Sequence, residues 1–149
     1  MWITGYTDAS FHRKDGGAWA VWLRCGAGRA VRRGTCPSYV RDSNAAELTA
    51  IYAGVYLACR IWPSTTAVLV CSDCRSALAA ADPSASLASD PAMRRLQQRL
   101  RELANAERLD LRFKWVRGHQ RASAGTSAWL NNQVDRLAGS TRRAARSAP

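Results

Sequence analysis

Four acidic residues stand beside predicted secondary-structure elements, at places where their carboxylates could meet: Asp8 at the end of a first strand, Glu47 at the opening of a helix, Asp73 just past a buried strand, and Asp135 near the start of a last helix. In open sheets, ligand sites form where strands end and the strand order switches, so we expect Asp8 and Asp73 to point into one crevice. Carboxylate oxygens suit hard divalent cations. Two such ions suit phosphodiester hydrolysis, because one activates water while the other stabilises the leaving oxygen. The four acids together predict a site for two magnesium ions.

Each acid taken alone also has an ordinary structural explanation. Asp8 could close a turn at the end of its strand, and Asp73 could cap the helix that follows it. Asn44 and Glu47 have the spacing of a capping box. Glu47 is harder to explain in this way, because it lies one turn before Ile51 on the apolar face of its helix, where a charge is costly unless it is paired. The metal-site prediction therefore depends on all four acids jointly.

Hydrophobic spacing predicts the elements that position these acids. Three short runs rich in Trp, Tyr, Val and Ile predict an antiparallel meander over residues 2–6, 18–24 and 30–36. The elements after it are a helix over about 44–61, a buried strand over 67–72, a short helix over 75–81, an amphipathic helix over 93–104, a strand over 109–115 and, after a loop over 118–128, a last helix from about residue 130. This order predicts an α/β protein, with a mixed sheet and helices packed on its faces. We expect one domain over residues 1–149, with residues 140–149 as a frayed basic tail.

Charge and cysteine content narrow the class of protein. Lys and Arg number 22 against 11 Asp and Glu, and the formal net charge of +11 favours polyanionic partners such as nucleic acid or acidic lipid. The five cysteines are an odd number, and several lie in apolar runs, which is typical of free thiols in a reducing cytosol. The sequence has neither a signal-peptide pattern nor an apolar stretch approaching roughly eighteen residues. We expect a soluble, cytoplasmic protein without a membrane partner.

Five segments carry a resemblance to a known family: YTDAS at 6–10, NAAEL at 44–48, CSD at 71–73, WVRGH at 115–119 and NNQVDRLA at 131–138. In their order, and in the elements that carry them, they resemble the type 1 ribonuclease H family. The resemblance implies the ribonuclease H-like fold, a five-stranded mixed sheet of three antiparallel and then two parallel strands with helices on both faces. It also implies a monomeric endonuclease that hydrolyses the RNA strand of RNA/DNA hybrids with two Mg²⁺ ions, or Mn²⁺, and leaves 5'-phosphate and 3'-hydroxyl ends.

The same resemblance implies a role for each site residue. Asp8 would bridge both ions, Glu47 and Asp73 would hold the ion on the leaving-group side, and Asp135 would hold the ion that carries the attacking water. His119 corresponds to a histidine of a mobile loop that assists proton movement or product departure, and a plain surface histidine is the less favoured alternative. Contacts to the substrate, including its 2'-hydroxyls, would involve Glu47 and groups at or around four further residues: Ser10, Ser43, Asn44 and Asn131.

The chain departs from the family pattern at three places. The first turn continues from Asp8 without the family's glycine-rich loop, and the segment from His119 to Asp135 is longer than usual. No tryptophan-rich basic handle lies between residues 73 and 115; the helix there carries arginines that either substitute for it or form a solvated face: Arg94, Arg95, Arg99 and Arg101. A hybrid-binding module without catalysis is the alternative function, since basic charge alone would also explain binding. The presence of all four acids and of His119 argues against that alternative.

Overall fold

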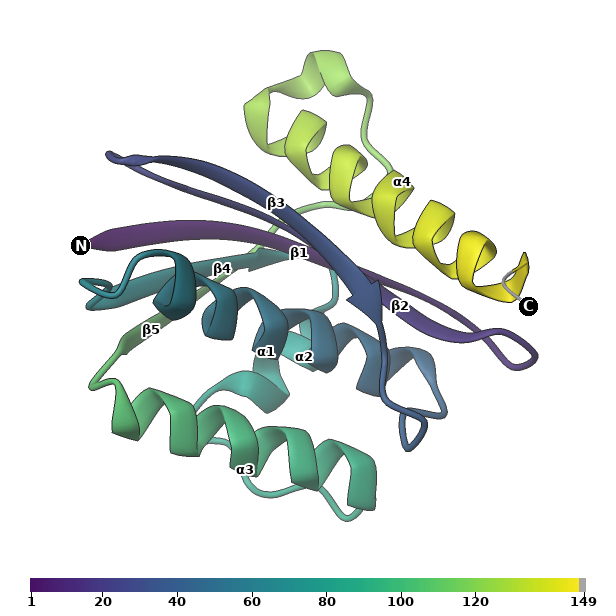
Figure 1. Ribbon diagram of the computed structural model, residues 1–149, viewed down its shortest axis with the longest axis horizontal. Helices are drawn as coiled ribbons and strands as arrows, with labels where there is room; N and C mark the ends of the chain where they lie inside the picture. The colour runs from purple at the N-terminus through teal and green to yellow at the C-terminus, as the bar shows by residue number, and fades with distance from the viewer. Residues whose placement is uncertain (148–149) are drawn as a thin grey trace.

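The computed structural model of the chain describes residues 1–147 and is built around one mixed β-sheet (Figure 1). Its strands are β1 (Trp2–His12), β2 (Gly16–Cys25), β3 (Gly28–Thr35), β4 (Ala67–Ser72) and β5 (Asp110–Trp115), in the spatial order β3-β2-β1-β4-β5. The first three strands pair antiparallel, whereas β4 runs parallel to both β1 and β5. The predicted sheet of three antiparallel and two parallel strands is therefore confirmed.

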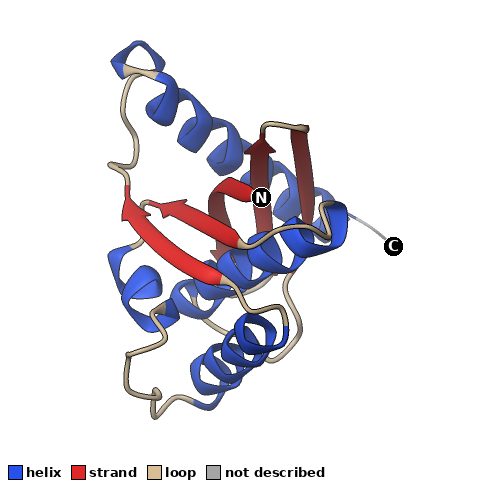
Figure 2. Ribbon diagram, turned by 90° about the vertical axis from the view of Figure 1, so that its left-hand side faces the viewer, coloured by secondary structure: helices blue, strands red, loops and turns tan. Residues whose placement is uncertain are grey.

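Helices cover both faces of the sheet, as predicted. α1 (Ser43–Ile61), α2 (Arg75–Ala81) and α3 (Pro91–Ala106) lie on one face, and α4 (Thr126–Ser147) lies on the other after the short 3-10 helix η1 (Ala122–Ala124) (Figures 1 and 2). An apolar core lies on each face of the sheet, and alternate side chains of β1 pack into one or the other. Ile3 packs into the core on the α1 side and Tyr6 into the core on the α4 side. Within residues 1–147, no helix is long and apolar enough to cross a membrane.

α1 is the buried helix that carries Glu47. Its N-cap is Asp42, whose Oδ1 accepts a hydrogen bond from the backbone N–H of Ala45 at 2.8 Å. Its core-facing side chains include three that are fully buried: Leu48, Ile51 and Val55. The capping box that was the alternative explanation for Asn44 and Glu47 does not form, because Asp42 caps the helix instead. Glu47 is consequently free to turn towards the sheet.

The first strand is longer than its sequence pattern indicated. β1 continues through His12, so Asp8 lies inside the strand and not at its end. The reason is the antiparallel pairing with β2, in which Asp8 is opposite Ala20 and the ladder continues to His12 and Gly16. All five cysteines are free, as predicted.

The last helix is also longer than predicted. α4 begins at Thr126, not near residue 130, and continues through Ser147. The frayed tail predicted from residue 140 is therefore wrong for residues 140–147, while residues 148 and 149 lie outside the described part of the chain. The physical reason is that Arg142 and Arg146 form ion pairs with Asp15, which hold the end of the helix against the turn between β1 and β2.

Candidate metal centre

Three of the four predicted acids gather at the place where β4 ends beside β1. The parallel pairing of these strands ends at Tyr6 and Cys71, and the chain then presents Asp8 from β1 and Asp73 from the segment after β4. Glu47 reaches the same place from the second turn of α1. One carboxylate oxygen from each of Asp8, Glu47 and Asp73 lies within 4.8 Å of the other two. Three chain segments far apart in the sequence thus supply one group of oxygen ligands.

Two oxygens in this group are buried without a hydrogen-bond donor among the described residues. They are Oδ2 of Asp8 and Oε2 of Glu47, whereas Oδ1 of Asp8 accepts the backbone N–H of Ala9 at 2.9 Å. A buried carboxylate oxygen without a partner is costly. A hard divalent cation is the ligand that such oxygens suit, so the residues present fit the metal that the sequence predicted.

The site strongly disfavours negative charge on its acids when no cation is bound. Burial is the largest cause that raises the pKa of Asp8 to about 10, and the nearby charges of Glu47 and Asp73 raise it further. Burial is also the largest cause that raises the pKa of Glu47 to about 8. Without a cation the site therefore favours the protonated form of these acids, and a bound cation would displace the protons.

Asp73 is held from three directions. The side-chain amide of Asn131 donates a hydrogen bond to Oδ2 of Asp73 at 3.3 Å, and the indole N–H of Trp115 donates to the Asp73 carbonyl oxygen at 3.1 Å. A Cβ atom on Gly118 would lie 2.7 Å from Oδ2 of Asp73, so only glycine fits there without movement. The guanidinium carbon of Arg75 lies 3.8 Å from the centroid of the Trp115 ring. Trp115 and Gly118 were not predicted as supports from the sequence, although both belong to the WVRGH segment that carries the family resemblance.

Asp135 approaches the site from the opposite face of the sheet. It lies on α4, is exposed, and stands outside the group formed by Asp8, Glu47 and Asp73. The Asp135 side chain is nevertheless the smallest of the causes that raise the pKa of Asp8. The structure thus brings three predicted ligands together and places the fourth beside one of them.

The predicted substrate-contacting residues fall into two groups. Ser43 and Asn44 are exposed in the first turn of α1, where Asn44 Oδ1 accepts a hydrogen bond from the hydroxyl of Ser76 at 2.9 Å. Ser10 is partly buried and accepts a hydrogen bond from Nε of Arg142 at 2.8 Å. Ser43 and Asn44 are therefore exposed to a ligand, although Asn44 Oδ1, like the Ser10 hydroxyl, already has a protein partner.

Asn131 and His119 differ in exposure. Asn131 is 1 % exposed, and its amide faces Asp73. His119 is exposed in the loop between β5 and η1, with a φ of 54° in the left-handed region. The buried Asn131 therefore supports Asp73, one of the candidate metal ligands, whereas the His119 side chain is open to solvent.

The arginines of α3 are all engaged with the protein. Nε of Arg94 donates to the carbonyl of Ala88, and Arg101 donates to that of Ala85. Two others lie over tyrosine rings, with guanidinium carbon to ring centroid distances of 4.3 Å for Arg95 over Tyr39 and 4.8 Å for Arg99 over Tyr52. α3 therefore presents a basic surface whose arginines are held in place.

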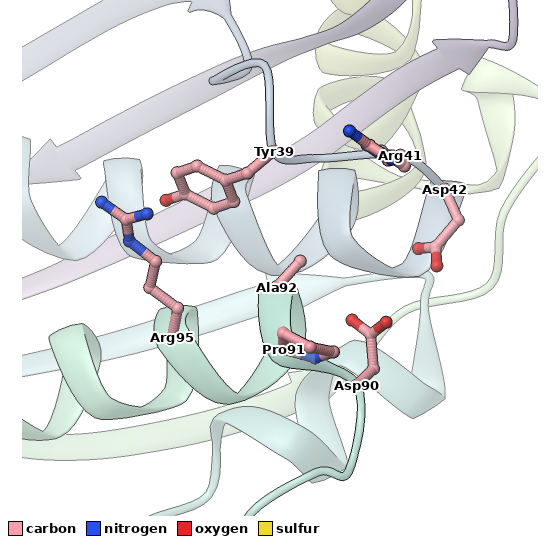
Figure 3. A pocket seen from close by; sticks show the side chains of 7 residues that line it. All are labelled: Tyr39, Arg41, Asp42, Asp90, Pro91, Ala92 and Arg95. Carbon is pink, nitrogen blue, oxygen red and sulfur yellow. The ribbon is translucent and has the colours of Figure 1, made fainter.

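A pocket of about 380 Å³ lies between the N-terminal ends of α1 and α3 (Figure 3). Its lining includes Tyr39, Arg95, Asp42 and Asp90. Both aspartates cap helices, because Asp42 caps α1 and Asp90 accepts the backbone N–H of Met93 at 2.9 Å at the start of α3. None of the four candidate metal ligands lines this pocket. The carboxylate group where β4 ends remains the better candidate for chemistry.

Comparisons with known proteins place this geometry in context. The family described as RNase H matches residues 2–143. The N-terminal RNase H domain of Rv2228c from Mycobacterium tuberculosis, solved as a fusion with maltose-binding protein, is 20% identical with a TM-score of 0.72 over 97% of this chain and 96% of that one. RNase H1 from the halophilic archaeon Halobacterium salinarum is 21% identical with a TM-score of 0.67 over 95% and 97%. LC11-RNase H1 in complex with an RNA/DNA hybrid is 14% identical with a TM-score of 0.70 over 97% and 99%. A search of curated proteins found no match.

Proposed function

The chain belongs to the RNase H family and is a ribonuclease H, and from this premise we propose that it cuts the RNA strand of RNA/DNA hybrids internally, using two bound divalent ions. The products would carry 5'-phosphate and 3'-hydroxyl ends. The observation that carries the proposal is the convergence of the Asp8, Glu47 and Asp73 carboxylates within 4.8 Å. This arrangement fits metal-assisted phosphodiester hydrolysis better than nucleic-acid binding alone, which requires no buried acids.

Four carboxylates would hold the ions, with Mg²⁺ as the expected metal and Mn²⁺ as a substitute. Asp8 would contact both ions, Glu47 and Asp73 the ion on the leaving-group side, and Asp135 the ion on the water side. When bound, these ions supply an activated water and stabilise the leaving oxygen. The chain's own contribution is to keep the ligands in place, through Asn131 and the close approach of Gly118 to Asp73.

The remaining roles concern protons and the substrate. His119 lies exposed in the loop after β5, where it would move a proton or assist the departure of the product. Ser43 and Asn44 are exposed at the start of α1 and would contact the 2'-hydroxyls of the RNA strand, together with Glu47. Ser10 and Asn131, which are less exposed than Ser43 and Asn44, would contribute to the same contacts with the substrate.

Two observations support an RNA/DNA hybrid as the substrate. LC11-RNase H1, which shares the fold, was solved in complex with an RNA/DNA hybrid. The net charge of +11 favours a polyanion, and the held arginines of α3 provide a basic surface without a tryptophan-rich handle.

The proposal is tested by incubating the protein with labelled RNA/DNA hybrid, double-stranded RNA and double-stranded DNA, each with Mg²⁺ and with chelator. We expect Mg²⁺-dependent internal cuts in the RNA strand of the hybrid only. Asp8→Asn is expected to abolish cleavage while hybrid binding stays equal or becomes tighter, because a ligand and one negative charge are removed. Asp110→Asn, at an exposed acid on β5, is the matched control and should cut normally.

The outcomes separate the two candidate functions. Tight, specific binding of the hybrid by the unmodified protein without any cutting would favour the inactive binding module. Full cleavage by Asp8→Asn would refute the assignment of the metal site even if the protein is a nuclease.

A further inference from the structure

β1 and α4 are joined by polar contacts on both sides of Asp8. Tyr6, Asp8 and Ser10 alternate along the strand and therefore share the face that α4 covers. At the first turn of α4, the hydroxyls of Tyr6 and Ser127 lie 2.8 Å apart in a hydrogen bond. Ser10 forms the contact on the other side of Asp8, through Arg142.

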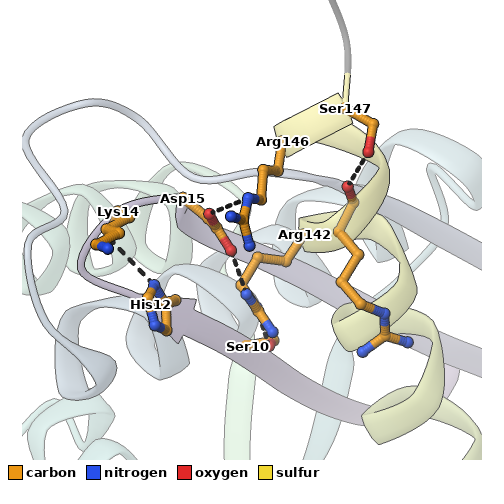
Figure 4. Close-up of polar contacts among 8 residues, drawn as sticks. Ser10, His12, Lys14, Asp15, Arg142, Arg146 and Ser147 are labelled. Atoms are coloured by element: carbon orange, nitrogen blue, oxygen red, sulfur yellow. Dashed lines mark hydrogen bonds and ion pairs between the residues drawn. The ribbon is translucent and has the colours of Figure 1, made fainter.

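The second contact is a network around a buried acid (Figure 4). Arg142 donates from Nε to the Ser10 hydroxyl at 2.8 Å and forms an ion pair with Asp15, in the turn between β1 and β2. Nε of Arg146 lies 3.4 Å from the other carboxylate oxygen of Asp15. The Asp15 side chain is only 2% exposed. An acid so deeply buried in a hairpin turn requires its cationic partners, since an unpaired buried charge is strongly unfavourable.

This network holds a part of α4 that lies beyond the second apolar core. In that core the buried residues of α4 are Leu130, Val134 and Ala138. The helix continues for more than two turns after Ala138, and exposed ends of helices ordinarily fray. Arg142 and Arg146 therefore supply the contacts that fix this end of the helix to β1.

The spacing places Asp135 midway between the two contacts. It lies eight residues after Ser127 and seven before Arg142, about two helical turns from each. Asp8 likewise lies two residues from both Tyr6 and Ser10 along β1. Asp135 is the one candidate ligand that comes from α4, so its distance from Asp8 depends on how that helix sits along the strand.

We propose that Arg142 and Asp15 are positioning residues, which fix α4 along β1 so that Asp135 stays beside Asp8 and completes the metal site. This inference rests on the proposed function for the identity of the ligands. It predicts that loss of the Arg142 contacts weakens metal binding without removing any of the four ligands.

The test compares Arg142→Met with Arg143→Met in the whole chain. Both variants remove one positive charge from neighbouring positions of α4, but Arg143 is exposed and makes no ion pair with Asp15. Mn²⁺ binding by calorimetry is the first readout, and the Mg²⁺ concentration for half-maximal cleavage is the second. For Arg142→Met we expect the Kd for Mn²⁺ and the half-maximal Mg²⁺ concentration both to rise about tenfold, as when supports of metal ligands are removed, with any change in the KM for the hybrid much smaller than that. Arg143→Met should match the unmodified protein.

Two further variants keep the test decisive. Asp15→Asn breaks the same network from the strand side and should weaken Mn²⁺ binding similarly. If Arg142→Met does not fold, Arg142→Lys, which keeps the charge but loses the forked contact to Ser10 and Asp15, takes its place and should show a smaller loss.

Three results would overturn the inference. One is a folded Arg142→Met protein with unchanged Mn²⁺ affinity, even if its melting temperature falls. Another is an equal loss of affinity in Arg143→Met, and the third is a change confined to the KM for the hybrid. Because calorimetry does not require cleavage, a failure of the proposed ribonuclease activity is distinguishable from a failure of the positioning role.

Discussion

The raised pKa values of Asp8 and Glu47 predict that the metal-free protein loses stability as the pH rises. Each acid is protonated in the folded state at a pH where it is ionised in the unfolded chain, so the unfolded state binds fewer protons and stability falls with pH. For Asp8 this window runs from its ordinary pKa of 3.8 to about 10, and for Glu47 from 4.5 to about 8. The stability of the metal-free protein that depends on these protonated acids is therefore fully present below about pH 4. It is lost progressively as the pH rises across the neutral range.

The magnitude follows from the linkage between protonation and folding. One acid in this condition lowers the free energy of unfolding by about 1.4 kcal/mol for each pH unit. Between pH 5.5 and 7.5, Asp8 alone would therefore cost about 3 kcal/mol, and Glu47 adds to this. In a chain of this length, the Asp8 contribution corresponds to a fall in melting temperature of about 6 to 12 °C.

The assay is thermal and urea unfolding in chelator at both pH values, for the unmodified protein, Asp8→Asn and the exposed control Asp110→Asn. Asp8→Asn cannot titrate at this position, so its free energy of unfolding should fall less steeply with pH than that of the unmodified protein. The difference between the two slopes should be about 1.4 kcal/mol per pH unit. Mg²⁺ should stabilise the unmodified protein more at pH 7.5 than at pH 5.5, because binding displaces protons. Equal slopes for the unmodified protein and Asp8→Asn would refute the reasoning that Asp8 is a buried, protonated acid.

Three further predictions follow from the site. Gly118→Ala should weaken Mg²⁺ binding and slow cleavage about tenfold, because its Cβ would meet Asp73 at 2.7 Å, whereas Gly26→Ala, where a Cβ meets nothing within 4 Å, should be neutral; calorimetry and single-turnover rates measure both. His119→Asn, which tolerates the φ of 54° and removes the imidazole, should slow turnover without ending it, and an unchanged steady-state rate would argue for a plain surface histidine. Hybrid binding should weaken steeply between 50 and 200 mM salt, by about a thousandfold for six phosphate contacts, and affinity independent of salt would contradict the electrostatic account of binding.

Local patterns were sufficient to predict the elements whose form is decided by burial. The continuous apolar run from Ala67 to Ser72 became the parallel strand β4, and the helical spacing of Leu48, Ile51 and Val55 became the buried helix α1. In both elements, the apolar side chains that form the sequence pattern are also the ones whose burial stabilises the element. These two elements carry or precede Glu47 and Asp73, which is why the sequence placed those acids correctly.

Features decided by distant partners could not be predicted in the same way. The continuation of β1 past Asp8 depends on its ladder with β2, and the last turns of α4 depend on an ion pair between Arg142 and Asp15, 127 residues apart. Similarly, the role of Gly118 becomes evident only when Asp73 lies against it. Each is a long-range contact whose partners carry no local signal of one another.

The unequal lengths of β1 and β4 explain why acids from both faces of the sheet can meet. Where β4 has ended beyond Cys71, β1 continues with β2 on one side only, so the sheet no longer separates α1 from α4 at that edge. Glu47 reaches Asp8 from the α1 side, and Asp135 reaches it from the α4 side. The same opening leaves Oδ2 of Asp8 without a donor from residues 1–147, the part that the structure describes. The first strand is longer than its sequence pattern indicated. Its extension past β4 therefore both lets Glu47 and Asp135 reach Asp8 and leaves a buried carboxylate oxygen that a cation would satisfy.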